Sequence, residues 1–279
     1  MPELAEVEYQ RARWDAGIGK KVESVFLHAG KRVFRRTDVG ALVEGITGAR
    51  LLGSETHGKQ MLFRFSGPGA LGVHLGMTGS LRVEPASYRP EKHDHLVLAI
   101  RGRSLVFNDP RQFGEIRWEA RETPSWWRDL PPQILERKFT QEHVDRFLER
   151  HARLPMKAIL LHQSGFPGIG NWMADEILWR AGIHPRRLAG SLDEEERARL
   201  RRVTRWVSRA AMQRVGRDNG EFPRSWLFPH RWEDGGICPR SKAPLVRETV
   251  GGRTTCWSPA LQPDPARSRG GARSTRKAR

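Results

Sequence analysis

The chain has only two cysteines, no long apolar run and a deficit of acidic residues, and each shortage excludes a class of protein. Cys238 and Cys256 are too few for a disulfide framework or for a four-thiolate zinc site. No apolar run reaches the ~18 residues that a membrane-spanning helix needs, and the N-terminus lacks the order of basic, apolar and small residues that marks a signal peptide. We therefore expect a soluble intracellular protein.

The deficit of acidic residues makes the chain strongly basic. It has 49 lysines and arginines against 32 acidic residues, which is a formal net charge of +17. Residues 263–279 hold six basic residues and one acidic residue, a net of +5, which leaves +12 on residues 1–262. A basic body favours a polyanionic partner, nucleic acid first. The alternative is a chain that is merely rich in arginine.

The first half of the 279-residue chain has the pattern of a β region behind one helix. Residues 3–17 form an amphipathic pattern that predicts a helix. Short apolar runs separated by glycine, proline and charged turns then continue to about residue 118, which is typical of an antiparallel β-sandwich or barrel. These runs are Val22–Leu27, Met61–Phe65, Leu71–Leu75, Leu96–Ile100 and Ser104–Phe107.

The second half has a helical pattern followed by a hairpin pattern. Helices are predicted at about 140–151, 155–163, 170–182 and 192–215. We interpret Ser191 to Glu194 as a capping box that opens the last helix, with Ser191 as the N-cap. The composition of the C-terminal tail predicts disorder. We thus expect domains at 1–120, 136–220 and 221–262, joined by a linker at 121–135 and followed by a basic tail at 263–279.

The N-terminus, Met1-Pro2-Glu3-Leu4-Ala5-Glu6, carries potential chemistry. Removal of Met1 would leave Pro2 with a free secondary amine. An α-amino group titrates near ~7.7–8.0, well below a lysine at ~10.4, so a useful fraction is neutral and can form a Schiff base. Glu3 and Glu6 place carboxylates beside it. The same residues also suit an ordinary helix start, because proline and acidic residues favour the first turn.

Four further segments stand out. Lys59 leads an apolar strand, and Met77 lies between paired glycines in His74–Leu81. Arg111 and Phe113 share a turn, where a cation and an aromatic side chain can wedge into a base stack. The segment Gly168–Pro185 joins a glycine loop to a helix N-terminus, which suits phosphate.

In this order, and with Lys92-His93-Asp94-His95, these segments resemble the formamidopyrimidine-DNA glycosylase/endonuclease VIII family of base-excision-repair enzymes. The resemblance covers about residues 1–262. It implies an α+β fold with an N-terminal antiparallel β-sandwich and a leading catalytic helix. A C-terminal helix-two-turns-helix domain with a zincless-finger β-hairpin would follow.

The resemblance also implies a bifunctional DNA glycosylase and AP lyase that acts on oxidised bases. Its partner would be double-stranded DNA with damaged bases or abasic sites, and we expect a monomer in the bacterial cytoplasm, associated with the nucleoid. One alternative is a non-catalytic damaged-DNA-binding protein of the same fold. A second is an RNA-binding protein that uses the helix-two-turns-helix motif alone.

Residue roles follow from the resemblance. Pro2 matches the nucleophile that attacks C1′, and Glu3 matches the general acid/base. Glu6 is the second helix carboxylate, and Lys59 matches the lysine that contacts phosphate and assists elimination. The remaining matches are the finger arginine Arg253, the void-filling residues Met77, Arg111 and Phe113, and the DNA contacts His93 and Asn171.

Two departures from the family pattern are visible. The four zinc-ligand positions of the finger fall on Cys238, Ser241, Ser258 and Leu261, and serine and leucine are not practical zinc ligands. We therefore expect no cofactor. The connection from Val215 to Cys238 is short compared with members that close a long loop over 8-oxoguanine, so a preference for that lesion is not expected.

Overall fold

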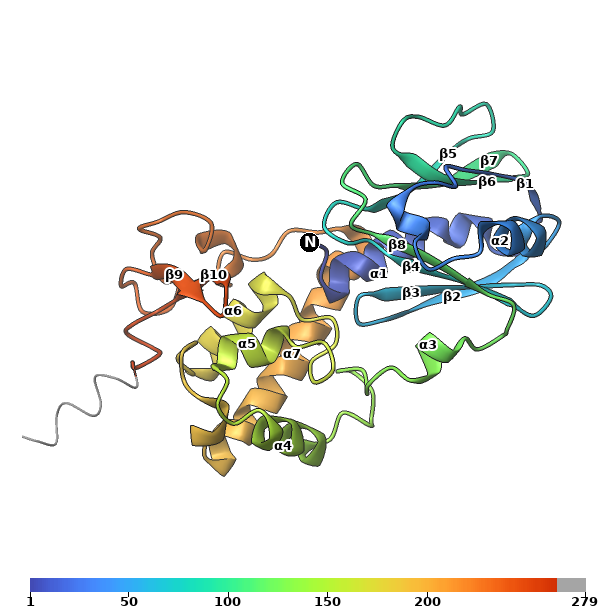
Figure 1. Ribbon diagram of the computed structural model, residues 1–279. Coiled ribbons are helices and arrows are strands. Elements are labelled where there is room, and N and C mark those ends of the chain that lie inside the picture. The colour runs from blue at the N-terminus through green and yellow to red at the C-terminus, as the bar shows by residue number, and fades with distance from the viewer. Residues whose placement is uncertain (265–279) are drawn as a thin grey trace, which may run out of the picture. The chain divides into compact units, whose positions relative to one another are not determined.

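The computed structural model describes residues 1–264, and these divide into two compact units (Figure 1). Unit 1 comprises residues 1–131 and 215–219, and unit 2 comprises residues 132–214 and 220–264. The tail that was expected to be disordered, 263–279, lies outside the described residues from 265 onward. Within the described part, no helix has the length and apolar character needed to cross a membrane.

Unit 1 is a sandwich of two four-stranded antiparallel sheets, so the sequence-based prediction is confirmed (Figure 1). One sheet has the order β1 (Val22–Leu27), β6 (Asp94–Ile100), β7 (Arg103–Asn108) and β5 (Ser80–Pro85). The other has the order β2 (Leu51–His57), β3 (Gln60–Phe65), β4 (Gly69–His74) and β8 (Glu115–Glu119). The helices of this unit are α1 (Leu4–Arg13), α2 (Val39–Ile46) and α3 (Ser125–Arg128), with 3-10 turns at Trp14–Gly17 and Arg32–Phe34.

The sequence pattern did not identify β2, β5 and β8, and all three are edge strands. Only one residue of β5 and one of β2 are buried. An edge strand exposes much of its surface, and its apolar alternation is therefore weak. The central strands, which are buried on the core face, gave a signal that was recognised, and so did the edge strand β1, which ends in the apolar run Val25–Leu27.

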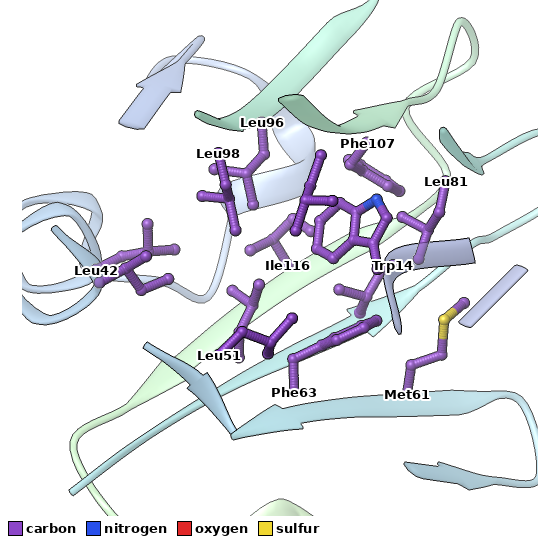
Figure 2. Packing of buried hydrophobic residues seen from close by; sticks show 14 of the residues in the cluster. Trp14, Leu42, Leu51, Met61, Phe63, Leu81, Leu96, Leu98, Phe107 and Ile116 are labelled. Carbon is purple, nitrogen blue, oxygen red and sulfur yellow. The ribbon is translucent and has the colours of Figure 1, made fainter. Parts of the chain in front are cut away.

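The core of unit 1 lies between the two sheets and is apolar (Figure 2). Trp14 is fully buried there and packs 4.9 Å, centroid to centroid, from the ring of Phe63. Its indole N–H donates to the backbone carbonyl of Arg82 at 3.2 Å, so its polar atom is satisfied. The residue that ends the N-terminal helix therefore anchors this helix in the core.

Unit 2 contains four helices and a two-stranded hairpin. They are α4 (Gln141–Arg150), α5 (Met156–Leu161), α6 (Asn171–Ala181), α7 (Glu194–Asp218), β9 (Val246–Val250) and β10 (Arg253–Trp257), with 3-10 turns at Ala189–Ser191 and Phe228–His230. The last residues of α7, from Val215, are grouped with unit 1. The predicted helices are all present.

The capping box predicted for α7 was placed two residues too early. Ser191 belongs to a 3-10 turn, and Leu192 is extended. The box is formed by Asp193 and Glu196: the Asp193 carboxylate accepts from the Glu196 N–H at 2.8 Å, and the Glu196 carboxylate accepts from the Asp193 N–H at 3.1 Å. Two overlapping patterns compete here, and aspartate is as good an N-cap as serine.

Candidate functional site

The N-terminus of α1 is built around a reciprocal capping box. Glu3 is the N-cap, its side chain accepts from the backbone N–H of Glu6, and the Glu6 carboxylate accepts from the Glu3 N–H at 3.1 Å. Glu3 is buried, with 2% of its surface exposed, and Pro2 is half-buried. The two predicted carboxylates are therefore held at the helix entry, directly after Pro2.

Polar contacts fix α1 against β2 and β5. Gln10 accepts from the backbone N–H of Leu81 at 2.8 Å, and Arg11 donates to the Ser54 hydroxyl at 2.6 Å. Thr56 donates to the Glu8 carboxylate at 2.6 Å. With Trp14 in the core, these bonds leave the helix, and hence Pro2, little freedom to move.

Lys59 lies in the two-residue turn between β2 and β3, where His57 pairs with Gln60. Gly58 has a positive φ of 59°, which the first position of such a hairpin turn requires. The Lys59 ammonium lies 3.9 Å from the Met1 sulfur. The structure therefore brings the predicted lysine to the N-terminus, although 57 residues separate it from Pro2 in the chain.

His74 at the end of β4 pairs with Gln60 of β3, and its position beside the Lys59 turn was not predicted from the sequence. Burial lowers the pKa of His74, and the positive charge of Lys59 lowers it further. Its Nδ1 accepts from the backbone N–H of Gly76 at 3.1 Å. A neutral imidazole whose other nitrogen is a donor therefore lies beside the Lys59 turn.

The loops that carry Met77, Arg111 and Phe113 lie against each other. All three side chains are exposed, and the guanidinium of Arg111 stacks over the Phe113 ring at 4.7 Å from its centroid. Gly76 has a φ of 61°, and a Cβ atom there would lie 2.4 Å from the backbone of Phe113. The predicted trio is thus brought together by two loops in van der Waals contact.

His93 contributes to the same region through its backbone. It directly precedes β6, and its carbonyl accepts from the backbone N–H of Asp109 at 3.0 Å. Its side chain is half-buried.

In unit 2, a glycine-rich loop connects α5 to α6 in a tight conformation. The side chain of Gln163 braces it, donating to the Ile169 carbonyl at 2.9 Å and accepting from the Gly168 N–H at 3.1 Å. A Cβ atom at position 165 would lie 2.4 Å from the Phe147 ring, so this position of the loop has room only for glycine. Gly170 is the N-cap of α6, and the helix begins at Asn171, one residue after the predicted start.

Asn171 connects this loop to the hairpin of β9 and β10. Its amide Nδ2 donates to the Thr254 carbonyl at 2.9 Å, and Thr254 is the neighbour of Arg253. Arg253 is exposed and follows Gly251 and Gly252, which both have positive φ. Two such residues form the tight turn that a two-residue hairpin favours. The two predicted site residues of unit 2 are therefore linked, because Asn171 is hydrogen-bonded to the immediate chain neighbour of Arg253.

A buried ionic cluster supports this arrangement. Asp175 on α6 pairs with Lys157 on α5 at 2.5 Å and with Arg231 at 2.6 Å, and all three side chains are buried. The Asp175 carboxylate also accepts from the Cys256 N–H of β10 at 3.0 Å, and Lys157 donates to the Asn171 carbonyl at 2.8 Å. No sequence motif indicated this cluster, because its members are distant in the chain.

The four positions aligned with zinc ligands do meet in space. The Cys238 sulfur accepts from the backbone N–H of Ser241 at 3.4 Å, and the hydroxyls of Ser241 and Ser258 lie 3.4 Å apart. Leu261 packs against the apolar cluster that contains Cys238. Two hydroxyls and a leucine side chain therefore lie close to Cys238 at the positions aligned with zinc ligands. Among the described residues, no group of histidine, cysteine and acidic residues is arranged to hold a metal ion.

The two cysteines differ in chemistry. Burial opposes ionisation of Cys238, but hydrogen bonds from Ser241, Ser258 and the indole of Trp179 outweigh it and lower the pKa of its thiol to about 7. Burial and the nearby charge of Asp175 raise the pKa of Cys256 to about 12. Hydroxyl and indole donors therefore stabilise the same thiolate that a metal ion would.

The connection between α7 and Cys238 packs onto the helices of unit 2. The buried carboxylate of Glu176 on α6 accepts from the backbone N–H groups of Leu227 at 2.8 Å and Phe228 at 3.1 Å. Six aromatic side chains, from α6, from α7 and from the connecting segment, pack against one another with ring-centroid distances of 4.7 to 5.6 Å. They are Trp172, Trp206, Phe222, Trp226, Phe228 and Trp232. This segment is fastened to its own unit.

Comparison with known proteins agrees with these local features. The formamidopyrimidine-DNA glycosylase N-terminal domain matches residues 1–116, and the formamidopyrimidine-DNA glycosylase H2TH domain matches residues 130–219. A formamidopyrimidine-DNA glycosylase of Thermus thermophilus is 37% identical over 94% of this chain and 98% of its own. That of Carboxydothermus hydrogenoformans is 33% identical over 94% of this chain and 100% of its own.

Solved structures are similar over the same extent. A complex between a Lactococcus lactis FPG mutant and a Fapy-dG containing DNA has a TM-score of 0.85 at 25% identity, covering 94% of this chain and 100% of that one. The wild-type Lactococcus lactis protein in complex with an oxidized pyrimidine containing DNA has a TM-score of 0.85 at 26% identity, with the same coverage.

Proposed function

Because the chain belongs to the formamidopyrimidine-DNA glycosylase family, it is a DNA glycosylase of base excision repair, and we propose that Pro2 is its nucleophile. The observation that carries the proposal is the buried capping box of Glu3 and Glu6, which holds Pro2 at the entry of a helix anchored in the core. Lys59 lies at the same place, beside Met1.

The reaction follows from these groups. Once Met1 is removed, the lone pair of the Pro2 nitrogen attacks C1′ of the damaged nucleotide, and the base leaves with the electron pair of the glycosidic bond. Glu3 assists as general acid/base: it accepts the proton that the Pro2 nitrogen loses and donates a proton to the ring oxygen as the sugar ring opens, which leaves the iminium ion. The resulting iminium ion makes the 2′ protons acidic. Loss of one of them, with Lys59 assisting, expels the 3′ phosphate and breaks the strand.

The DNA contacts divide between the two units. Met77, Arg111 and Phe113 would fill the space left by the extruded nucleotide, and His93 would contact the strand beside it. In unit 2, Asn171 at the N-terminus of α6 and Arg253 at the hairpin turn would grip backbone phosphate. A helix N-terminus favours an anion, and a guanidinium can bind phosphate with two parallel hydrogen bonds.

Trapping by borohydride tests the proposal, because borohydride reduces the iminium ion to a stable covalent adduct. Mature protein and abasic-site DNA should give this adduct, whereas protein that retains Met1 should give none. Pro2→Gly keeps an amine and should trap more weakly. Wild-type yields of adduct from protein with an intact Met1 would show that another group is the nucleophile.

The alternative of a damaged-DNA-binding protein without turnover makes the opposite prediction. Such a protein would bind lesion DNA and yield no reduced adduct. The joint presence of Pro2, Glu3 and Lys59 argues against it, since binding alone needs neither a nucleophilic amine nor a general acid/base.

We also propose that the protein acts without zinc, as a monomer in the bacterial cytoplasm, where its substrate is the chromosome. The hydrogen bonds around Cys238 support the first point, because they satisfy the thiol without a metal ion. Serine and leucine at the other aligned positions are unsuitable ligands.

Lesion preference should favour ring-opened or ring-saturated bases over 8-oxoguanine. The bonds from Glu176 to Leu227 and Phe228 support this, since a segment fastened to α6 has little freedom to close over a base. Discrimination would then depend on how easily a nucleotide is extruded, and poorly stacked bases cost less to flip. Single-turnover rates on 8-oxoguanine and a hydantoin in one duplex context test this; a faster rate on 8-oxoguanine contradicts it.

A further inference from the structure

Asp109 joins two loops through one buried carboxylate. It directly follows β7 and is fully buried. Its Oδ2 accepts from the backbone N–H of Gly114 at 2.7 Å. Its Oδ1 accepts from the Thr78 hydroxyl at 2.8 Å and from the Arg111 N–H at 3.3 Å. Thr78 belongs to the other loop, so the carboxylate bridges segments that are 31 residues apart.

The backbone of Asp109 is held as firmly as its side chain. Its N–H donates to the His93 carbonyl at 3.0 Å, and its carbonyl lies 3.0 Å from Nε2 of the fully buried His95. Burial lowers the pKa of His95 by more than its hydrogen bond to the Asp109 carbonyl raises it. The neutral ring therefore carries its proton on Nε2 and donates to the Asp109 carbonyl. An unprotonated Nε2 would place its own lone pair against a lone pair of the carbonyl oxygen, which is repulsive.

The loops are also in direct contact beneath these bonds. At Gly76, a Cβ atom would lie 2.4 to 2.6 Å from backbone atoms of Phe113 and Gly114. Neither loop can shift without displacing the other. The exposed side chains of Met77, Arg111 and Phe113 therefore stand on one jointly braced base.

We propose that Asp109 is a positioning residue that clasps these two loops into a single rigid wedge, so that Met77, Arg111 and Phe113 enter the base stack together. The proposal rests on the proposed function. Extruding a nucleotide costs a few kcal/mol, and a wedge that is already ordered loses less conformational entropy on insertion than two separately mobile loops. Asp109 itself touches no DNA in this scheme.

Thr78 offers a matched pair of variants. Its side chain is exposed, so Thr78→Val should fold normally while it removes the hydroxyl that donates to Asp109. Thr78→Ser keeps this hydroxyl and serves as the control. Asp109→Asn is the second disruptive variant. It keeps the shape of the side chain, but it has one neutral amide oxygen in place of the two charged oxygens that accept from Thr78 and Gly114.

Two substrates separate wedging from chemistry. A duplex with a paired damaged base requires extrusion, whereas an abasic site has no base to extrude. Thr78→Val should slow base release from the paired lesion by about tenfold, as expected for one hydrogen bond to a charged group. It should leave borohydride trapping on the abasic site near the wild-type level, and Thr78→Ser should match wild type on both.

A fluorescent 2-aminopurine opposite the lesion reports insertion of the wedge directly. Wild type and Thr78→Ser should unstack it, and Thr78→Val and Asp109→Asn should do so less. If Thr78→Val or Asp109→Asn slows the reaction equally on the paired lesion and on the abasic site, or if neither variant changes base release, the proposal that Asp109 clasps the two loops is wrong. A wild-type protein that fails to trap would instead overturn the proposed function, and the fluorescence signal would still decide whether the clasp exists.

Discussion

The interiors of the two units differ in what holds their site residues. In unit 1, Pro2, Lys59 and the wedge loops stand on a sandwich whose core is a large apolar cluster between two sheets (Figure 2). In unit 2, the apolar cluster under the hairpin has five buried members, Trp179, Leu227, Cys238, Leu245 and Cys256. Asp175, with Lys157 and Arg231, lies beside this small cluster and bonds to both α6 and β10.

If the finger acts without zinc, as proposed, the difference identifies what would hold the hairpin in its place. A structural zinc site supplies folding free energy of about 10–16 kcal/mol in small domains, and a hairpin without zinc has to be held by its other contacts. Buried charges that are paired and hydrogen-bonded can hold a unique geometry, although their net contribution to stability is small. In unit 1, burial of the apolar core already stabilises the sandwich, and the buried carboxylate of Asp109 holds only the loops at its edge.

Removal of the Asp175 charge should lower the stability of the protein most, and the loss of stability should be confined to unit 2. Asp175→Asn leaves Lys157 and Arg231 buried without a counter-ion, and breaking a buried pair costs about 3–5 kcal/mol. Hydrogen exchange should show loss of protection in α5, α6 and β10 but not in the strands of unit 1. Asp234→Asn, which breaks the exposed pair with Arg247, is the control and should change little. Equal loss of hydrogen-exchange protection in both units would show that the buried charges of Asp175, Lys157 and Arg231 do not stabilise unit 2 in particular.

Arg253→Ala should separate binding from stability within unit 2. Arg253 is exposed at the hairpin turn, so its loss should leave the melting temperature nearly unchanged. A lost guanidinium–phosphate contact should weaken lesion binding by about tenfold to a hundredfold. Arg253→Lys should recover only part of this, because an ammonium is a point charge. A folded Arg253→Ala protein with unchanged excision would show that the alignment of the finger is wrong.

The Cys238 thiolate should make the stability of unit 2 depend on pH. The pKa of Cys238 is lowered to about 7 in the fold, so its contribution is lost as pH falls through 7 and is complete above the unfolded value near 9. The difference in free energy of unfolding between wild type and Cys238→Ser should grow by on the order of 2 kcal/mol from pH 7 to 9. Cys256→Ser should show no such gain, because the pKa of that thiol is raised to about 12 in the fold, so its contribution is complete below the unfolded value near 9 and falls as pH rises above it.

Chelation of metal ions should have the smallest effect. Elemental analysis of the active protein should find well under one zinc per chain, and a chelator should leave excision and melting temperature unchanged. The backbone N–H of Ser241 and the indole N–H of Trp179 already donate to the Cys238 sulfur. Stoichiometric zinc, or unfolding of the hairpin by chelator, would make the finger a metal site after all and would contradict the contrast between the units.

Much of this molecule could be predicted from local patterns. The central strands of unit 1 and all four helices of unit 2 were recognised, because a buried strand and an amphipathic helix each have a strong hydrophobic period. Failures occurred where the local signal was weak or ambiguous. Strands β2, β5 and β8 lie at sheet edges, and the competing N-caps Ser191 and Asp193 are only two residues apart.

The sequence alone determined the candidate chemistry: Pro2 beside two glutamates, Lys59, the Arg111–Phe113 turn, Asn171 after its glycine loop and Arg253. Each is recognisable because the chemistry needs that residue type at that place in a short motif. Only the tertiary structure decided what holds these residues in place, namely the buried carboxylates Asp109 and Asp175. Their partners are 31 residues away at Thr78 and 81 residues away at Cys256. No local pattern encodes such pairs, because they are specified by the packing of whole elements.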